Sequence, residues 1–117
     1  MPRRARIRKR SEIRALYSRG KRRRTEHLDV FVADSPVLRT RLAVVVPKYG
    51  RRIVARNRVK RQLREGARLE LLPRCQDRKM ALDLLIRARP AAYEAGFQIL
   101  REEIRELAER LCSPSSS

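Results

Sequence analysis

Apolar residues recur along this chain with two periods, one typical of helices and the other typical of strands. Ile13, Leu16 and Tyr17 lie on one side of a helix that would begin at Ser11 and stop at Gly20. Ser11 is the expected N-cap, and Gly20 is the expected left-handed residue after the last turn. The first predicted element is therefore a short helix with one apolar face.

Three stretches with strand character follow this helix. Residues 21–26 are too basic for the interior of a sheet and fit a short edge strand. Residues 28–33 alternate between an aliphatic face and a face with Phe31, which either lies beneath a helix or offers its ring to an unpaired base. The apolar run 42–46 is expected to be a central strand that is buried on both faces and ends at Pro47.

The longest predicted helix extends from about Val54 to Leu71 and stops before Pro73. A strand over residues 80–86 and a final helix over residues 91–111 complete the pattern. At about 100° per residue, the long helix places four apolar or small residues on one narrow side: Val59, Leu63, Gly66 and Ala67. Six polar residues fall on the adjoining arc: Arg56, Asn57, Lys60, Arg61, Arg64 and Arg68. This helix thus offers one edge to a core and one cationic edge to a partner.

The order of elements predicts an α+β fold in a single small domain, with a helix, two to four mostly antiparallel strands, a basic helix, a strand and a C-terminal helix. A length of 117 residues suits one domain with one modest core. The domain is assigned to residues 11–112, with a basic flexible arm over residues 1–10 and a disordered polar tail over residues 113–117.

Charge narrows the class of partner. The net charge of +18 and the pI near 11.6 imply strong self-repulsion, which a nucleic acid would neutralise. Residues 1–24 hold twelve Lys or Arg against one Glu, and residues 48–64 hold eight Lys or Arg with no acidic residue. Residues 91–112, by contrast, hold three Arg and five Glu. The cationic surface is therefore expected to be one-sided and to exclude the last helix.

Groups that could perform catalysis are scarce. The chain has one histidine, no phosphate-binding glycine loop and no paired carboxylates outside the last helix. Cys75 and Cys112 are expected to be unpaired thiols, because their spacing fits neither a zinc site nor a disulfide framework. A metal-dependent nuclease would need Asp29 and Asp83 to meet across the sheet, and this hypothesis is one alternative to RNA binding.

Membrane association is not expected. No apolar run is long enough to span a bilayer, and the basic N-terminus is not followed by the apolar core of a signal peptide. We therefore expect a cytoplasmic protein, and the sequence leaves its oligomeric state open.

The basic helix carries the residues by which this chain resembles a known family. The RNR signature of the protein component of bacterial ribonuclease P is similar to Ala55-Arg56-Asn57-Arg58-Val59-Lys60-Arg61-Gln62-Leu63-Arg64-Glu65. The family's N-terminal segment is similar to Ile7-Arg8-Lys9-Arg10 and Leu16-Tyr17-Ser18-Arg19-Gly20-Lys21, and its last strand to Leu84-Leu85-Ile86-Arg87-Ala88-Arg89-Pro90. The resemblance covers residues 7–111 in one unbroken order.

The resemblance implies a fold in which the basic helix leads through a left-handed crossover to the final strand. It also implies a function, that of an RNA-binding protein subunit of ribonuclease P. The family's partner is a catalytic RNA that removes the five-prime leader from precursor tRNA. Hydrolysis would be performed by magnesium ions held on the RNA, with no catalytic side chain and no metal site in the protein.

The resemblance also assigns two sets of residues by position. The catalytic RNA would be bound by Arg56, Asn57, Arg58, Lys60, Arg61 and Arg64. A cleft between the first helix and the sheet would hold the single-stranded leader, with Ile13, Tyr17, Arg24, Phe31, Val46 and Lys48. A ribosomal or general RNA-binding protein is a second alternative, which would bind RNA without promoting leader removal.

Two departures from the family pattern affect the leader cleft. The loop Pro47-Lys48-Tyr49-Gly50-Arg51 stands where most members have a Ser-Lys-Lys-Val-Gly-like sequence. Ile13 stands where the family often has phenylalanine, which leaves Tyr17 as the expected stacking ring.

Overall fold

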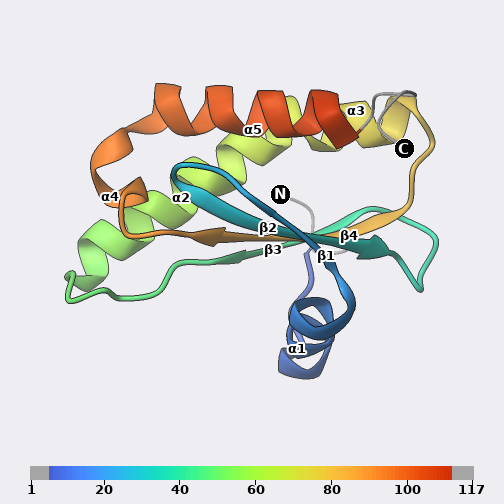
Figure 1. The fold of residues 1–117 in the computed structure, drawn as a ribbon, viewed down its shortest axis with the longest axis horizontal. Coiled ribbons are helices and arrows are strands. Elements are labelled where there is room, and N and C mark those ends of the chain that lie inside the picture. Colours follow the sequence, from blue (N-terminus) through green and yellow to red (C-terminus); the bar gives the residue numbers. More distant parts are fainter. Residues whose placement is uncertain (1–5, 112–117) are drawn as a thin grey trace.

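A computed structural model describes residues 6–111 as helices packed on both faces of a four-stranded sheet. Figure 1 shows α1 on one face of the sheet and α2 and α5 on the other, which confirms the predicted α+β class. The elements in chain order are α1 (Arg10–Arg19), β1 (Lys21–Arg24), β2 (Leu28–Asp34), β3 (Arg41–Val45), α2 (Ile53–Glu70), α3 (Leu72–Asp77), β4 (Leu82–Ala88), α4 (Ala92–Ala95) and α5 (Phe97–Leu111).

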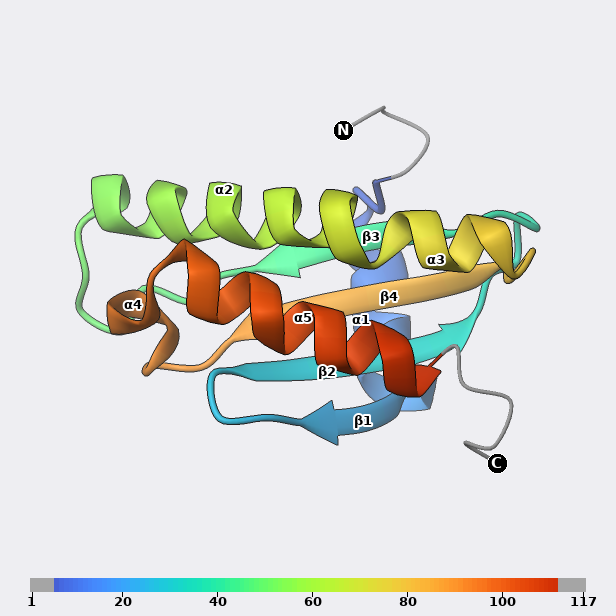
Figure 2. The same cartoon turned by 90° about the horizontal axis from the view of Figure 1, so that it is seen from above.

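The sheet has the order β1-β2-β4-β3. Strand β2 pairs antiparallel with β1 and β4, whereas β3 and β4 are parallel neighbours that α2 connects. Seen from the side of α2 and α5 in Figure 2, this connection crosses in the left-handed sense. Nearly all such connections are right-handed, so the unusual crossover implied by the family resemblance is confirmed.

Strand alternation divides the apolar residues between two cores. Leu28, Val30 and Leu84 belong to the larger core, which the sheet shares with α2 and α5. Phe31 and Leu85 point to the opposite face, where they pack with Leu16 of α1 in the smaller core. The predicted two-faced alternation of β2 is therefore confirmed, and Phe31 lies beneath a helix, the first of its two predicted alternatives.

The prediction of a central strand over residues 42–46 was wrong in one respect. Strand β3 is at an edge of the sheet, although both of its faces are covered: Leu42 faces the larger core and Ala43 the smaller one. The free edge of β3 is met by the chain before α1, where Arg6 forms a parallel bridge with Leu42 and the Ile7 N–H donates to the Leu42 carbonyl at 2.8 Å. The apolar composition of a strand indicates that its faces are buried, whereas the position of β3 in the sheet depends on how the chain crosses from β3 through α2 to β4.

The ends of α1 also differ from the prediction. The helix begins at Arg10 with Lys9 as N-cap, so Ser11 lies inside the first turn and caps nothing. Gly20 has φ −72°, which any residue can adopt, so it is not the expected left-handed residue. Glycine is needed there for space, since a Cβ would lie 2.6 Å from the Leu16 carbonyl oxygen and 3.2 Å from the Phe31 Cβ.

The long helix α2 spans Ile53–Glu70, which confirms the predicted helix to within one residue at each end. After Leu71 a short helix, α3, follows, with Pro73 in its first turn, where a missing N–H costs nothing. The final helix is divided at Gly96, whose φ of 83° turns the chain between α4 and α5. Strand β4 begins and ends two residues later than predicted.

One residue of the predicted arm contributes to a core: Ile7 is buried with 5% exposure and belongs to the smaller core. Residues 1–5 of the predicted arm, the tail 113–117 and Cys112 lie outside the described residues. Cys75 is fully buried in the larger core. Among residues 6–111, no helix has the length and apolar character needed to cross a membrane.

We predict that Gly20→Ala destabilises the protein by about 1–3 kcal/mol, because the added Cβ collides with backbone and forces α1 away from the sheet. Urea denaturation followed by circular dichroism measures the free energy of unfolding. Ser18→Ala, at an exposed position of the same helix, is the matched control and should change it by less than about 0.5 kcal/mol. Equal stability of the two variants would show that the close approach at Gly20 is not needed.

Candidate RNA-binding surfaces

The basic helix α2 has one edge buried in the larger core. Val59, Leu63, Gly66 and Ala67 are all buried, which confirms the narrow apolar side predicted from their spacing. A Cβ on Gly66 would lie 2.8 Å from Ile104 Cδ1, so α2 and α5 approach closely at this residue. This packing determines which edge of α2 is left open to solvent.

The open edge of α2 forms a shallow groove that contains most of the predicted signature residues. The groove is lined by Val54, Asn57, Lys60, Arg61 and Arg64. Val54 was absent from the predicted set, because an apolar residue gave no signal for an RNA site; it is 74% exposed. The groove therefore combines cations and one amide with an exposed aliphatic side chain.

Two signature residues lie outside this groove. Arg56 is half-buried, and its Nε donates to the Val46 carbonyl at 3.0 Å, which ties the start of α2 to the end of β3. Arg58 is exposed and lies about 120° around the helix from Arg64. The signature thus covers two edges of α2 rather than one.

The cations of α2 are crowded together. Burial lowers the pKa of the Lys60 ammonium group, and the neighbouring charges of Arg56 and Arg64 lower it further. No acidic side chain of the described residues forms an ion pair with Arg56, Arg58, Lys60, Arg61 or Arg64. This surface therefore holds concentrated positive charge that the domain itself does not neutralise.

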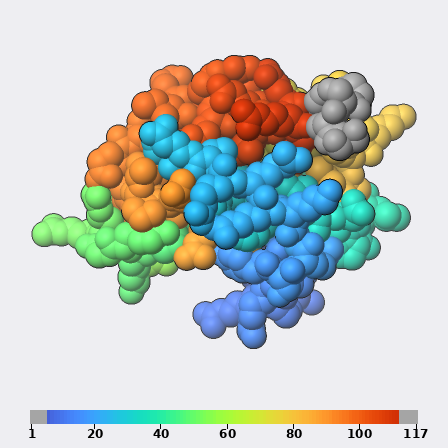
Figure 3. All heavy atoms as spheres, in the orientation of Figure 1, coloured from blue at the N-terminus to red at the C-terminus, as the bar shows by residue number. Residues whose placement is uncertain are grey.

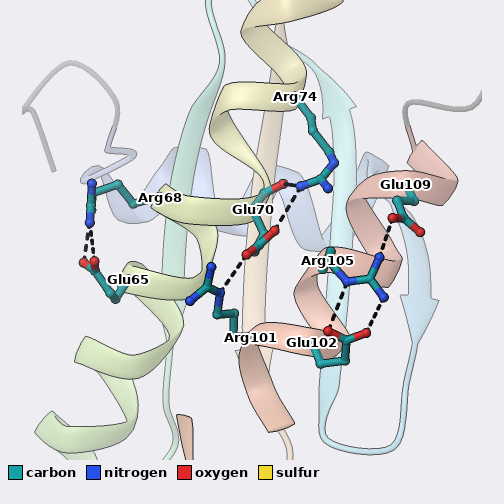
Figure 4. Close-up of polar contacts among 8 residues, drawn as sticks. All are labelled: Glu65, Arg68, Glu70, Arg74, Arg101, Glu102, Arg105 and Glu109. Carbon is teal, nitrogen blue, oxygen red and sulfur yellow. Dashed lines mark hydrogen bonds and ion pairs between the residues drawn. The ribbon is translucent and has the colours of Figure 1, made fainter. Parts of the chain in front are cut away.

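The acidic residues near α2 are paired with other arginines, as Figure 4 shows. Arg68, which the sequence placed on the cationic arc, is paired with Glu65 and no longer belongs to the unpaired set. Glu70 accepts from Arg101 Nε at 2.7 Å and from Arg74 Nη1 at 3.1 Å, which joins α2 to α3 and α5. On α5, Arg105 is paired with Glu102 and Glu109.

A second surface lies on the opposite face of the sheet, beside α1. The rings of Tyr17 and Phe31 meet edge to face, with centroids 4.9 Å apart and an interplanar angle of 74°. Phe31 is only 7% exposed, whereas Tyr17 and Ile13 are half-buried. Tyr17 is therefore the more accessible ring of this pair.

Cations flank both rings. The Arg87 guanidinium lies 5.9 Å from the Tyr17 centroid, and that of Arg22 lies 5.8 Å from the Phe31 centroid. Neither arginine was in the predicted leader set. Strand alternation was the available signal, since pairing across the sheet puts Arg22 opposite Phe31 and Arg87 opposite Asp29 on this face.

The remaining leader residues are not all on this face. Arg24 is exposed, and its Nε donates to Asp29 Oδ1 at 2.9 Å. Lys48 is exposed at the start of a tight turn in which the Arg51 N–H donates to the Lys48 carbonyl at 2.8 Å. Val46, in contrast, is 2% exposed and belongs to the larger core, so its side chain does not reach the surface beside α1.

The hypothesis of a metal site at Asp29 and Asp83 is wrong. Asp29 pairs across the sheet with Arg87, four residues along β4 from Asp83, which separates the two carboxylates by roughly 13 Å. Each is also already ion-paired, Asp29 with Arg24 and Asp83 with Arg41. These two residues therefore cannot share one metal ion in this fold.

Asp83 instead takes part in a buried ion-pair network that holds α1 against the sheet. Arg41 donates to both oxygens of Asp83, at 3.0 and 2.8 Å, and also lies 2.7 Å from Glu12 of α1. The hydrogen bonds that Arg41 donates to Asp83 are the main cause of the raised pKa of Arg41. This network joins β3, β4 and α1, and so positions the helix that carries Ile13 and Tyr17.

The α+β fold, the unneutralised cationic groove on α2 and the aromatic surface beside α1 together define a small basic RNA-binding domain. Known proteins agree with this class. The sequence profile of the family described as ribonuclease P matches residues 1–112. The chain belongs to this family.

Its relatives carry the same name. The ribonuclease P protein component of Desulfovibrio desulfuricans is 40% identical, with 100% of this chain and 92% of that protein covered. That of a Cyanothece species is 34% identical over 87% of this chain and 88% of its own length. The chain is thus the protein component of a ribonucleoprotein endoribonuclease, with the family's role in processing the five-prime leader of tRNA with an RNA subunit.

Solved structures share the fold. The Staphylococcus aureus RNase P protein has a TM-score of 0.77 at 21% identity, covering 93% of this chain and 95% of its own. The RNase P protein from Thermotoga maritima has a TM-score of 0.73 at 24% identity, covering 90% and 96%. The arrangement of two layers of helices around a mixed sheet is therefore shared by proteins of low sequence identity.

We predict that Glu70→Gln destabilises the protein by about 1 kcal/mol near neutral pH, because it weakens the charge-assisted bonds from Arg101 and Arg74. The arginines hold the pKa of Glu70 below its ordinary value of 4.5. The stabilising effect is therefore present above pH 4.5 and is lost as the pH falls through the lower, folded-state pKa.

Urea denaturation at pH values from 3 to 7 measures this difference between wild type and variant, which should be constant above about pH 5.5 and shrink below about pH 4.5. Glu106→Gln, at an exposed position of α5, makes the same chemical change and should cost less than about 0.5 kcal/mol. A difference that does not depend on pH would assign the effect of Glu70→Gln to packing instead.

Proposed function

We propose that this chain binds the catalytic RNA of ribonuclease P through α2 and the single-stranded leader of precursor tRNA through the surface beside α1. The observation that supports this most directly is the set of α2 cations without an acidic partner among residues 6–111. Arginine forks match pairs of phosphate oxygens, so a polyanionic RNA would replace the missing partners.

The signature residues divide into three roles under this proposal. Lys60, Arg61 and Arg64 contact phosphates along the groove, and Asn57 donates to or accepts from a phosphate or a ribose hydroxyl. The Nε of Arg56 donates a hydrogen bond to the Val46 carbonyl, and the other N–H groups of its guanidinium contact RNA at the edge of the groove. Arg58 contacts a separate part of the same RNA on the other exposed edge of α2.

The leader is bound by a smaller set of residues than the resemblance implied. Tyr17 stacks on one leader base, with Ile13 beside it and Phe31 beneath it as support rather than as a second platform. Arg24, Lys48 and Arg87 attract the leader phosphates. Val46 is left out of this set because its side chain is buried in the larger core.

Catalysis is assigned to the RNA in this proposal. Magnesium ions held by RNA phosphates perform the hydrolysis, and no side chain of this protein takes part in the chemical step. The protein screens RNA phosphates through α2 and holds the leader beside α1, and these two helices lie on opposite faces of the sheet (Figure 1). Phosphate screening should lower the magnesium concentration that the catalytic RNA needs to fold and bind its substrate.

Cleavage of precursor tRNA across a magnesium series tests the proposed function. The wild-type protein should shift half-maximal cleavage to lower magnesium than the RNA alone requires. The double variant Lys60→Gln/Arg61→Gln should lose most of this shift and bind the catalytic RNA about tenfold or more weakly, because two charge-assisted phosphate contacts are lost.

The matched control removes two charges elsewhere. Arg78→Gln/Arg110→Gln changes two exposed residues, one after α3 and one on α5, and should behave as wild type. Equal losses in both double variants would show that net charge alone is responsible. Superposable magnesium curves with and without wild-type protein would refute the proposed function and favour a general RNA-binding protein.

Tyr17→Leu should weaken binding of precursor tRNA by about 1–3 kcal/mol if the ring stacks one leader base. The measurement is the affinity of the protein–RNA holoenzyme for precursors that carry leaders of increasing length and for mature tRNA. Binding of mature tRNA should not change, because it has no leader.

Phe97→Leu is the aromatic control for this variant, at a half-buried position at the start of α5 on the other side of the sheet. It should not alter leader binding. An unchanged leader dependence in Tyr17→Leu, or a loss that follows the unfolding of the variant, would return Tyr17 to a purely structural role.

A further inference from the structure

Next to the groove on α2 lies a second hollow, in which only Arg64 and Ile13 belong to the predicted sites. It has a volume of about 270 Å³ and lies between the chain before α1, strand β3 and helix α2. Arg6, Arg8 and Arg64 line it, together with the apolar residues Ile7, Ile13, Leu42, Ala43 and Val44. The hollow thus has three cations and an apolar floor, with no acidic side chain.

Two of these arginines are held in place from different parts of the chain. The backbone at Arg6 is fixed by its bridge to Leu42 and by the following hydrogen bond from the Ile7 N–H. Arg64 is fixed by helix α2, one residue after the fully buried Leu63. The fold therefore fixes the backbone of both arginines beside the hollow, and their side chains start from opposite sides of it.

Among residues 6–111, neither Arg6 nor Arg64 forms an ion pair, and the buried Nε of Arg6 has no hydrogen-bond partner there. An unsatisfied buried donor is costly and uncommon in native proteins. Burial lowers the pKa of Arg64, and the positive charge of Arg6 lowers it further, so the two like charges repel each other across the hollow.

We propose that Arg6 and Arg64 together bind one phosphodiester group of the catalytic RNA in this hollow. An anion between two fixed guanidinium groups would satisfy the Arg6 Nε, remove the repulsion and gain from the low-dielectric floor. This proposal rests on the proposed function, since it names a further contact of the same RNA.

The catalytic RNA is favoured as the source of the phosphate because Arg64 lines both this hollow and the groove on α2. A strand that lies in the groove therefore passes Arg64 and can place its next phosphate against Arg6. The chain before α1 would then take part in binding through a fixed residue, and not merely through diffuse positive charge.

The test compares Arg6→Gln, Arg64→Gln and the double variant in their binding of the catalytic RNA over a range of KCl concentrations. Each single variant should bind about tenfold or more weakly at low salt. If the two arginines share one phosphate, the double variant should lower the slope of log affinity against log salt by about 0.7–0.9 in total. Independent phosphates would lower it by about twice that amount, which would overturn the shared site.

Stability provides a second, RNA-free measurement. Replacing either arginine removes a repulsive charge, so neither single variant should be less stable than wild type in urea denaturation. Inorganic sulfate should raise the thermal midpoint of wild type more than that of the double variant at matched ionic strength. Arg78→Gln, whose side chain is exposed after α3, should respond to sulfate as wild type does.

The possible outcomes separate this site from the proposed function. If wild type stimulates cleavage but neither arginine variant loses affinity, the site is refuted while the function stands. If wild type fails to bind the catalytic RNA, the function fails, and the sulfate measurement alone judges the anion site. A loss confined to precursors with long leaders would assign the phosphate to the leader and overturn the choice of partner.

Discussion

Repulsion among unneutralised cations on α2 is the constraint on which the rest of this structure depends. Among the described residues, the acidic side chains pair with other cations: Asp83 and Glu12 hold Arg41, Glu70 at the end of α2 holds Arg74 and Arg101, and the acidic residues of α5 hold Arg105. Close packing of α2 against α5 at Gly66 keeps the helix in place despite its crowded charges. Repulsion between these cations destabilises the free protein, and binding of a polyanion removes that repulsion.

The sheet separates two surfaces with different chemistry. The groove on α2 offers cations, an amide and Val54, which suits phosphates and the edges of a folded RNA. The face beside α1 offers one accessible aromatic ring among arginines, which suits an unpaired strand. In Figure 3, α1 forms a lobe below the sheet while α5 covers the opposite side. The buried network of Arg41, Asp83 and Glu12 holds α1 in place against the sheet.

Much of the fold was predictable because its signals are local. The 3.6-residue period identified the buried side of α2, and strand alternation placed Phe31 on the face opposite the larger core. The errors came where contacts between distant residues determine the structure. Strand β3 is apolar on both faces and yet lies at an edge of the sheet. Glycine is needed at position 20 because β2 lies close to it, and not because of its φ angle. The candidate site shows the same division, since α2 was found from its residues, whereas Arg22, Arg87 and Arg6 were not.

The sequence by itself determined that one helix has an apolar edge and a cationic edge, because the angle between residues on a helix depends only on their spacing. It also determined the family, through the run from Ala55 to Glu65. Only the tertiary structure decided which cations are unpaired, that Val46 faces the wrong core for a leader contact, and that Arg6 and Arg64 share one hollow. Those facts depend on contacts between residues far apart in the chain, which are brought together by the left-handed connection from β3 through α2 to β4.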